Sequence, residues 1–187
     1  MGQAQKEKNE LWEWTKALLI AFGLAFIIRL FLFTPIIVDG ESMMPTLENG
    51  DSMLVNKIGY VIGEPERFDI VVFHAPEQKN YIKRVIGLPG DHVEYKNDQL
   101  FINGKEVAEP YLEQKKSEIT DGTLLTGDFT LESITGDKKI PEGYVFVMGD
   151  NRLYSKDSRM IGLVKIDEII GKTNFVFWPL GEAGFVK

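Results

Sequence analysis

Hydrophobic and polar positions divide the chain into one long apolar run near the N-terminus and a series of shorter runs after it. Residues 1–16 are polar, and residues 17–34 carry one charge, Arg29, before Pro35 ends any helix. As a helix this run measures about 27 Å at ~1.5 Å per residue, which just crosses the hydrocarbon core of a bilayer. The pattern predicts a helix over 17–34.

Three interpretations of the run 17–34 compete. A buried core helix is disfavoured because Leu, Ile, Phe and Ala lie on every face and leave no polar stripe for water. A cleavable leader is disfavoured because residues 34–38, Thr-Pro-Ile-Ile-Val, offer no small-x-small cleavage site. An uncleaved transmembrane anchor fits best, with Arg29 near enough to the far interface for its side chain to reach water.

The charges that flank the run predict the orientation of this anchor. Three lysines precede it, whereas residues 30–56 contain no Lys or Arg and several acidic residues. Positively charged flanks stay on the cytoplasmic side of a membrane. We therefore expect residues 1–16 in the cytoplasm and residues 35–187 on the extracytoplasmic face of the membrane.

Beyond the anchor the hydrophobic pattern becomes that of β-strands. Short runs rich in β-branched and aromatic residues are each bounded by Gly, Pro, Asp or Asn. Asn103-Gly104 lies between two of these runs and predicts a tight hairpin turn. Only residues 167–170 indicate a helical turn. The predicted strands are 53–55, 68–73, 81–86, 92–95, 99–102, 105–107, 144–148 and 175–178.

These strands predict a mainly β fold, an antiparallel sandwich or distorted barrel, in a domain at 35–187 behind the anchor. Residues 113–139 are polar and lack a sustained period, so we expect a small lobe inserted between strands at about 96–142. At 187 residues, 44% of them hydrophobic, the chain has room for one core of ordinary size.

Composition and charge exclude several classes of function. The net charge of −7 and the lack of clustered Lys and Arg disfavour nucleic acid as a partner. The absence of cysteine removes disulfides, thiol catalysis and zinc sites with Cys ligands. The two histidines, His74 and His92, are not at metal-ligand spacing, so we expect no metal and no cofactor.

A polar turn between the anchor and the first predicted strand holds a candidate nucleophile, Ser42, although a turn serine usually has no chemical role. No Gly-x-Ser-x-Gly elbow is present, and a Ser-His-Asp triad with either histidine stays open but disfavoured. A lysine base must be neutral, which requires apolar burial. Lys83 is the candidate because it lies within the apolar run 81–86, where the alternative is an edge-strand charge.

Four segments resemble, in order, the motif boxes of the bacterial type I signal peptidases, a family of Ser-Lys serine peptidases. They are residues 42–47, 50–51, 83–91 and 149–159. Four boxes behind one anchor are a specific signal, and the resemblance extends from the anchor to the last strands. It implies a membrane-bound endopeptidase that removes signal peptides from secretory preproteins after small-x-small sites such as Ala-x-Ala, with membrane lipid around its anchor.

The resemblance also implies roles for individual residues. Ser42 attacks the scissile carbonyl, and Lys83 acts as general base and then donates a proton to the leaving amine. Ser155 matches the serine that orients the lysine, and Asp157 and Arg159 match a pair that supports the site. Residues 150–152 match the same box and are interpreted as architecture around it.

Two positions depart from the family pattern. Some members carry a serine two residues before the nucleophile, whose hydroxyl donates to the oxyanion, and here that residue is Gly40. We expect the Ser42 backbone N–H to be one oxyanion donor, and the Gly40 amide or a water to be the second. Leu153 and Tyr154 replace polar residues, and we expect them to change packing more than chemistry.

Candidate walls of a substrate pocket follow from strand parity. If residues 36–42 are extended, Ile36 and Val38 lie on the same face as Ser42. An extended substrate would then add to the sheet edge as a further strand. The alternative for every wall candidate is core packing. The resemblance adds four more candidates, Met43, Leu47, Tyr81 and Ile82.

Two other functions are kept as alternatives. A self-cleaving repressor shares the Ser-Lys chemistry but carries a DNA-binding domain, which the acidic charge and the apolar run disfavour. A membrane-anchored, non-catalytic β-domain that binds exported proteins or cell-wall material would need neither Ser42 nor a buried Lys83. Covalent labelling of Ser42 by a serine-directed probe would separate this binding domain from the enzyme.

Overall fold

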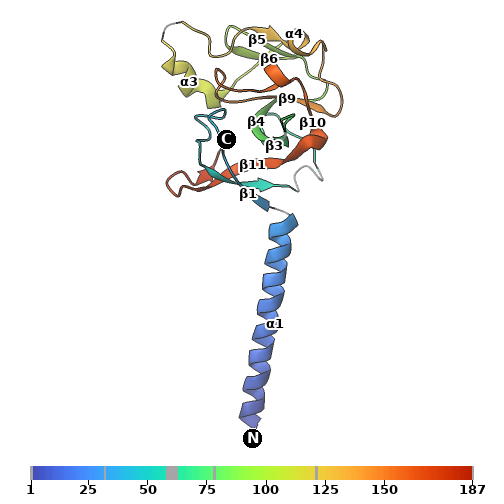
Figure 1. Ribbon diagram of the computed structural model, residues 1–187, viewed down its shortest axis with the longest axis vertical. Helices are drawn as coiled ribbons and strands as arrows, with labels where there is room; N and C mark the ends of the chain where they lie inside the picture. Colours follow the sequence, from blue (N-terminus) through green and yellow to red (C-terminus); the bar gives the residue numbers. More distant parts are fainter. Residues whose placement is uncertain (1, 32, 58–62, 78, 121, 187) are drawn as a thin grey trace.

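The computed structural model describes residues 2–31, 33–57, 63–77, 79–120 and 122–186 (Figure 1). Helix α1, Gly2–Phe31, covers both the segment predicted to be cytoplasmic and most of the predicted anchor. Strand β1, Phe33–Ile37, follows it, so residues 33 and 34 belong to a sheet and not to the helix. The helix therefore ends earlier than predicted, because Phe33 and Thr34 pair with Asn56 and Val55 of the next strand.

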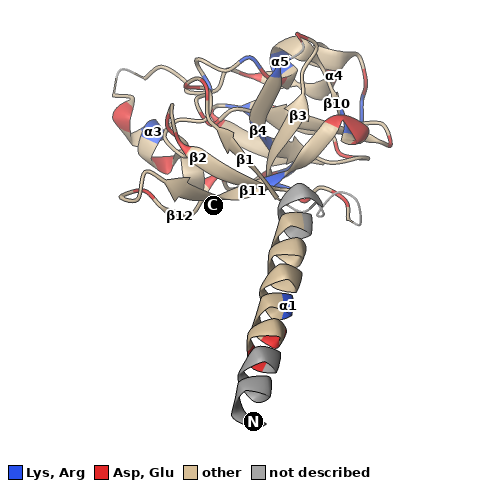
Figure 2. Cartoon of the chain, turned by 60° about the horizontal axis from the view of Figure 1, so that its bottom comes forward, with Lys and Arg blue, Asp and Glu red and all other residues tan. Residues whose placement is uncertain are grey.

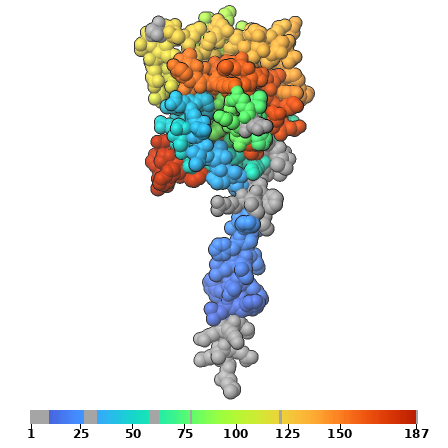
Figure 3. Space-filling view, in the orientation of Figure 1, coloured from blue at the N-terminus to red at the C-terminus, as the bar shows by residue number. Residues whose placement is uncertain are grey.

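Helix α1 extends away from the β-rich part of the molecule (Figure 3). Its described side chains beyond the charged N-terminal half are apolar, and Leu18, Ile20 and Phe22 are 56–72% exposed. Among the residues that the structure describes, no helix combines the length and the apolar character needed to span a bilayer. The predicted anchor, 17–34, includes residue 32 and the side chains of 27–31, which lie outside the described residues.

The larger sheet is antiparallel and forms the centre of the molecule, with strand order β1-β2-β11-β3-β4-β9-β10 and β12 paired to β11. This confirms the prediction of a mainly β, antiparallel fold. Strand β4 pairs with β3 on one edge and with β9 on the other, so it is a central strand of the sheet. The remaining strands of the sheet are β2 (Ser52–Asn56), β3 (Ile70–His74), β4 (Asn80–Gly87), β9 (Tyr144–Met148), β10 (Val164–Lys165), β11 (Ile169–Trp178) and β12 (Gly184–Phe185).

The smaller sheet, with order β7-β6-β5-β8, lies beyond the larger one at the end remote from α1 (Figure 1). Asn103 and Gly104 join two of its strands with φ of 53° and 77°, which confirms the predicted tight hairpin. The polar stretch 113–139 contains two short helices that the sequence pattern did not predict. The elements here are β5 (Val93–Lys96), β6 (Gln99–Ile102), β7 (Lys105–Val107), η1 (Pro110–Leu112), α3 (Glu113–Glu118), β8 (Phe129–Thr130) and α4 (Leu131–Thr135).

Two strand boundaries differ from the predictions for identifiable reasons. Strand β3 begins at Ile70 because Phe68 has φ of 72°, which a β-strand cannot contain. Strand β11 begins at Ile169, where a helical turn was predicted, because Ile169 pairs with Phe73 in the sheet. The helical turn η2, Ile166–Glu168, ends just before it. The remaining helix, α5, spans Ser158–Ile161.

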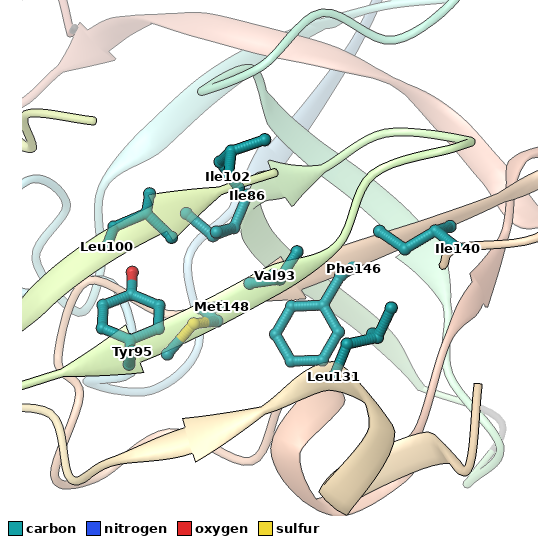
Figure 4. Packing of buried hydrophobic residues seen from close by; sticks show 9 residues of the cluster. All are labelled: Ile86, Val93, Tyr95, Leu100, Ile102, Leu131, Ile140, Phe146 and Met148. Atoms are coloured by element: carbon teal, nitrogen blue, oxygen red, sulfur yellow. The ribbon is translucent and has the colours of Figure 1, made fainter. Parts of the chain in front are cut away.

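The core consists of three clusters of buried side chains. The largest fills the space between the two sheets and includes Tyr95, Leu131 and Phe146 (Figure 4). A second cluster, around Phe73 and Val147, lies within the larger sheet's curl. The third contains Val38, Met43, Leu47, Met53, Ile70 and Val176, and it packs directly behind the turn that carries Ser42.

Candidate active site

Ser42 and Lys83 meet although 41 residues separate them in the chain. Ser42 lies in the turn between β1 and β2, and Lys83 lies in the middle of β4. The Lys83 Nζ atom donates to Ser42 Oγ at 2.7 Å and to the Ile82 carbonyl at 2.9 Å. Lys83 is only 3% exposed. Burial lowers the pKa of the Lys83 ammonium to about 8, even though the carboxylates of Asp157 and Asp150 act to raise it.

Arg84, the next residue along β4, is buried on the opposite side of the strand. Its Nε and Nη2 atoms donate to the two carboxylate oxygens of Asp150 at 2.9 and 2.6 Å. Thr46 Oγ1 donates to the same carboxylate at 2.5 Å, so this pair ties the nucleophile turn to β4. Because β4 is a central strand, the alternative in which Lys83 and Arg84 are edge-strand charges is wrong.

The loop after β9 holds the backbone of the nucleophile turn. The Asn151 amide N–H donates to the Ser42 carbonyl at 3.0 Å, and Asn151 Nδ2 donates to the Glu41 carbonyl at 3.0 Å. Gly149 allows this approach, since a Cβ atom there would lie 2.3 Å from the Ser42 carbonyl oxygen and 2.2 Å from Ser155 Oγ. These residues fall inside the motif segments, but their residue types gave no chemical signal from sequence alone.

Asp157 and Arg159 form the ion pair that the family resemblance implies. The Asp157 carboxylate accepts from Arg159 Nε and Nη2 at 2.9 and 2.8 Å and from the Gly149 amide at 3.0 Å. Burial acts to raise the pKa of the Asp157 carboxyl, but the hydrogen bonds and the charge of Arg159 outweigh it and lower the pKa. Asp157 is therefore an anion at neutral pH, in range of the Lys83 amine.

Ser155 lies at the predicted place, but it does not form the predicted hydrogen bond with Lys83. Its hydroxyl is buried and forms no hydrogen bond with the Lys83 amine among the described residues, although it helps to lower the pKa of the neighbouring Asp157 carboxyl. The Lys83 amine contacts Ser42 and the Ile82 carbonyl instead. The orienting role of Ser155 thus stays a prediction.

The two expected oxyanion donors differ in their surroundings. Among the described residues, no acceptor takes the backbone N–H of Ser42, which leaves this N–H available to a ligand. The Gly40 amide donates to Asn49 Oδ1 at 2.9 Å and is therefore occupied. The second donor expected at Gly40 is not free in this arrangement, because the turn uses that amide for its own closure.

A cleft of about 730 Å³ opens in front of Ser42. Five of the six predicted wall residues line it, namely Ile36, Val38, Met43, Tyr81 and Ile82. The sixth, Leu47, is fully buried in the cluster behind the turn, so it serves the core and does not line the cleft. Sequence reasoning missed the charged rim of the cleft, formed by Glu77, Lys79 and Lys156.

The two histidines do not take part in the Ser42 site. His74 Nδ1 lies 3.0 Å from Asn80 Oδ1, and His92 Nδ1 lies 2.9 Å from the Lys138 carbonyl. Within the described ranges, no three His, Cys, Asp or Glu side chains gather as metal ligands would. Lysine is therefore the base that this geometry offers to the serine.

Comparison with known proteins assigns the family. The sequence profile of the family described as "Signal peptidase, peptidase S26" matches residues 11–178, which is most of the chain. The chain belongs to this family. The chain is 53% identical to signal peptidase I of Bacillus caldolyticus, over 99% of each chain. It is 46% identical to signal peptidase IB of Staphylococcus aureus, over 94% of this chain and 93% of the other.

A solved structure supports the same family assignment. The crystal structure of a signal peptidase I from Enterococcus faecalis V583 is 45% identical in sequence and superposes with a TM-score of 0.57. The match covers 59% of this chain and 97% of that chain. As a member of the peptidase S26 family, the chain is a serine endopeptidase. The Ser42–Lys83 pair lies in a cleft, as the active site of such an enzyme must.

Proposed function

We propose that this peptidase removes signal peptides from secretory preproteins, with Ser42 as nucleophile and Lys83 as general base. The observation that carries the proposal is the 2.7 Å contact between Lys83 Nζ and Ser42 Oγ, made by an amine that is almost completely buried. A lysine can accept a proton from serine only when it is neutral. Burial supplies that condition, since it brings the pKa of Lys83 to about 8.

The reaction follows from these groups. Neutral Lys83 accepts the Ser42 hydroxyl proton while Oγ attacks the scissile carbonyl carbon. The Ser42 backbone N–H donates to the oxyanion, and Lys83 then gives its proton to the leaving amine. Water hydrolyses the acyl-enzyme, with Lys83 again as base. The anionic Asp157 limits how far the pKa of Lys83 falls, so the protonated intermediate state is stabilised.

The cleft favours an extended peptide with small residues near the cut. Among the described strands, β1 lies at the edge of the sheet and pairs with β2 alone, so its other edge can bind a substrate backbone. Ile36, Val38 and Ile82 give apolar walls on the side of the cleft next to Ser42. Shallow apolar pockets accept alanine and reject larger side chains, which is the basis for cleavage after Ala-x-Ala.

The membrane anchor and its orientation belong to the same proposal. The exposed apolar side chains of α1 would be unfavourable in water and are compatible with lipid. Trp178, Leu180 and Phe185 are also exposed, in the β11–β12 region at the end of the domain from which α1 departs (Figure 1). Attachment at the extracytoplasmic face would hold the cleft close to precursors whose signal peptides lie in the bilayer.

Cleavage of a secretory precursor by the purified protein in detergent tests the proposal. We expect Ser42→Ala and Lys83→Ala each to reduce cleavage on the order of 10³-fold or more, since members of a catalytic pair act as a unit. Chelation by EDTA should have no effect. Full activity in either variant would exclude the Ser42–Lys83 pair.

A serine-directed probe gives a second measurement that needs no precursor. Covalent labelling at Ser42 in the wild type, absent from Ser42→Ala and reduced in Lys83→Ala, is the expected result. Labelling of another serine, or equal labelling of Ser42 with and without Lys83, would count against lysine as the base.

A further inference from the structure

The charged rim of the cleft contains a chain of contacts that the reaction above does not use. Lys156 forms an ion pair with Glu77, and Tyr81 Oη donates to the other oxygen of that carboxylate at 3.0 Å. Glu77 lies in the connection between β3 and β4, and Lys156 lies between Ser155 and Asp157. The contacts therefore join two walls of the cleft across its solvent side.

The same series of contacts, Lys156–Glu77–Tyr81, reaches Lys83 through the Tyr81 ring. The Lys83 Nζ atom lies 5.1 Å from the centroid of this ring, on the side of β4 that faces Ser42. Phe73 also contacts the ring, in an edge-to-face arrangement with 6.1 Å between centroids. The ring is thus fixed at two places, by Phe73 and by the hydrogen bond from its hydroxyl to Glu77.

We propose that Glu77 and Lys156 are positioning residues, which hold the Tyr81 ring against the Lys83 amine and so keep water from the general base. The inference rests on the proposed function, because it concerns the base of that reaction. Neither residue touches the reacting atoms. Their effect passes through Tyr81.

Direct charge effects do not explain a role for Glu77. The charges that act on Lys83 are those of Asp157 and Asp150. Within the described residues, the groups that face the Lys83 amine are Ser42 from the turn, Asp157 and Asp150 from the loop after β9, and Tyr81 on its own strand. The charged residues that line its cleft are Asp39, Glu41, Glu77, Lys79 and Lys156. Any influence of Glu77 on Lys83 must therefore be carried by the Tyr81 hydroxyl.

Two effects of the ring oppose each other, and their sizes decide the direction. A ring face near an amine favours the ammonium, and such a cation–π contact changes the pKa of a desolvated amine by about 1.5 units. Burial acts in the other direction and brings the pKa of Lys83 from 10.5 to about 8. Release of the ring would expose the Lys83 amine to water, so the pKa of its ammonium form should rise.

The contacts between Lys156, Glu77 and Tyr81 persist over the pH range of an assay. The hydrogen bond from Lys156 lowers the pKa of the Glu77 carboxyl, and burial together with Glu77 raises the pKa of the Tyr81 phenol. Glu77 therefore stays ionised and Tyr81 stays protonated while Lys83 titrates. The Lys156–Glu77 pair is half-exposed, and exposed ion pairs contribute little, so the Tyr81–Glu77 hydrogen bond should carry most of the effect.

The test measures kcat/KM against pH for cleavage of a secretory precursor by the full chain in detergent. We expect Glu77→Ala and Tyr81→Phe each to move the acid limb upward by about 0.5–1 pH unit, because partial exposure restores part of the ordinary lysine pKa. The double variant should shift no further than either single variant. Lys156→Met should shift the limb less, and Glu77→Gln, whose amide oxygen still accepts from Tyr81, should resemble Lys156→Met.

Lys79→Met is the matched control. It removes a cation from the same rim but breaks neither contact of the chain, so its acid limb should coincide with that of the wild type. An unchanged limb in Glu77→Ala, additive shifts in the double variant, or a change confined to KM would overturn the inference. Additive shifts would show that Glu77 acts on Lys83 independently of Tyr81, and the other two outcomes would assign Glu77 to substrate binding or to no role in the reaction.

A direct titration separates this inference from the proposed function. The Lys83 Cε resonance, assigned by its loss in Lys83→Met, reports the protonation of the amine without any substrate. We expect its midpoint to rise in Glu77→Ala and Tyr81→Phe. If the wild type cleaves no precursor, the proposed function fails, yet this titration still decides whether Glu77 acts on Lys83. Equal midpoints in wild type and Glu77→Ala would refute the inference even if cleavage is observed.

Discussion

Lys83 combines two properties that conflict at the scale of a single residue. Its side chain is almost completely buried, and the Ser42 hydroxyl and one carbonyl are its hydrogen-bond partners. An ammonium with so few partners is costly to remove from water. The carboxylates of Asp157 and Asp150 offset only part of that cost, since the pKa still falls to about 8. The proposed general base therefore destabilises the fold.

Replacement of this lysine by an apolar residue of similar length should stabilise the protein. Unfolded Lys83 has a pKa of 10.5 and folded Lys83 one of about 8, so the unfolded state binds more protons between these values and stability rises with pH there. Below about pH 8 the full cost is present, up to ~3 kcal/mol. We expect Lys83→Met to raise the free energy of unfolding by about 1–3 kcal/mol at pH 7, in urea unfolding in detergent.

The advantage of Lys83→Met should shrink as the pH rises from 8 to 10.5, where the wild-type amine is neutral in both states. Lys165→Met, at an exposed position of β10, is the control and should change stability little at any pH. A destabilised Lys83→Met variant at pH 7 would mean that the carboxylates more than compensate the burial of the charge.

The pH dependence of the wild-type enzyme follows from the same group. With neutral Lys83 as the proposed base, we expect kcat/KM to rise through about pH 8 and to be about tenfold lower at pH 7 than at pH 9. His74→Gln and His92→Gln should leave this profile unchanged, because each histidine is hydrogen-bonded elsewhere. An acid limb near pH 6.5 that disappears in either histidine variant would assign the base to histidine.

At the scale of elements, the site depends on how closely the end of β9 approaches the nucleophile turn. Three residues after β9 contact this turn: Asn151 at the Ser42 and Glu41 carbonyls, Asp150 at Thr46, and Gly149 in close packing. The same loop continues into Asp157, which caps α5. The proposed nucleophile, base and supporting ion pair are thus held by one loop against one strand.

Gly149→Ala should test this close approach. The added Cβ would lie 2.3 Å from the Ser42 carbonyl oxygen, so the backbone must move and the nucleophile with it. Since a displacement of about 1 Å costs on the order of 10²-fold in rate, we expect at least that loss in kcat/KM. Gly127→Ala, where the added Cβ meets nothing within 4 Å, should retain activity. Equal activity of the two variants would show that the turn can move without consequence.

The elements also explain how far sequence reasoning reaches. Strand runs such as 99–102 and the Asn103-Gly104 turn are local patterns, and they appear in the structure as predicted. Strand β11 was found only at its C-terminal end, because Gly171, Lys172 and Asn174 interrupt the pattern of β-branched residues. Pairing with β2 and β3, which includes Gly171 and Lys172, extends the strand across this interruption. Leu47 looked like a pocket wall beside Ser42, but its burial depends on packing with Met53 and Val176.

The Glu77–Lys156 contact could not have been predicted from sequence for the same reason. The two residues are 79 positions apart, and although Lys156 lies in the motif segment 149–159, the resemblance implied no role for it. The pairing of Ser42 with Lys83 was accessible only because motif segments of a known family carried it. Periodicity alone left an edge-strand lysine equally possible, and only the central position of β4 removes that alternative.

At the scale of the whole molecule, the β-rich part and α1 differ in how charged residues are distributed. Charged residues are scattered over the loops and strands of the β-rich part, whereas along α1 the described charges lie in the N-terminal half only (Figure 2). The adjoining helix segment exposes Leu19, Phe22 and Phe26 without any polar neighbour to shield them. A helix segment with such exposed apolar side chains requires an apolar environment, and lipid would supply it in the proposed anchor.

Charges placed on α1 should separate this anchoring from catalysis. We expect Leu19→Asp combined with Phe22→Asp to move the protein from the membrane to the soluble fraction, because each central aspartate opposes insertion by about 3 kcal/mol. Cleavage of a short detergent-soluble peptide should stay at the wild-type rate, since α1 lies outside the cleft. Cleavage of a membrane-held precursor should fall, because the enzyme loses its high local concentration.

Leu124→Asp is the control for this experiment. Leu124 is an exposed apolar residue between α3 and β8, so an added charge there should leave membrane recovery unchanged. If the α1 double variant still sediments with membranes, attachment must come from the β11–β12 surface, where Trp178 and Leu180 are exposed. If it leaves the membrane but cleaves membrane-held precursors at full rate, confinement contributes nothing, and the cleft alone accounts for the choice of substrate.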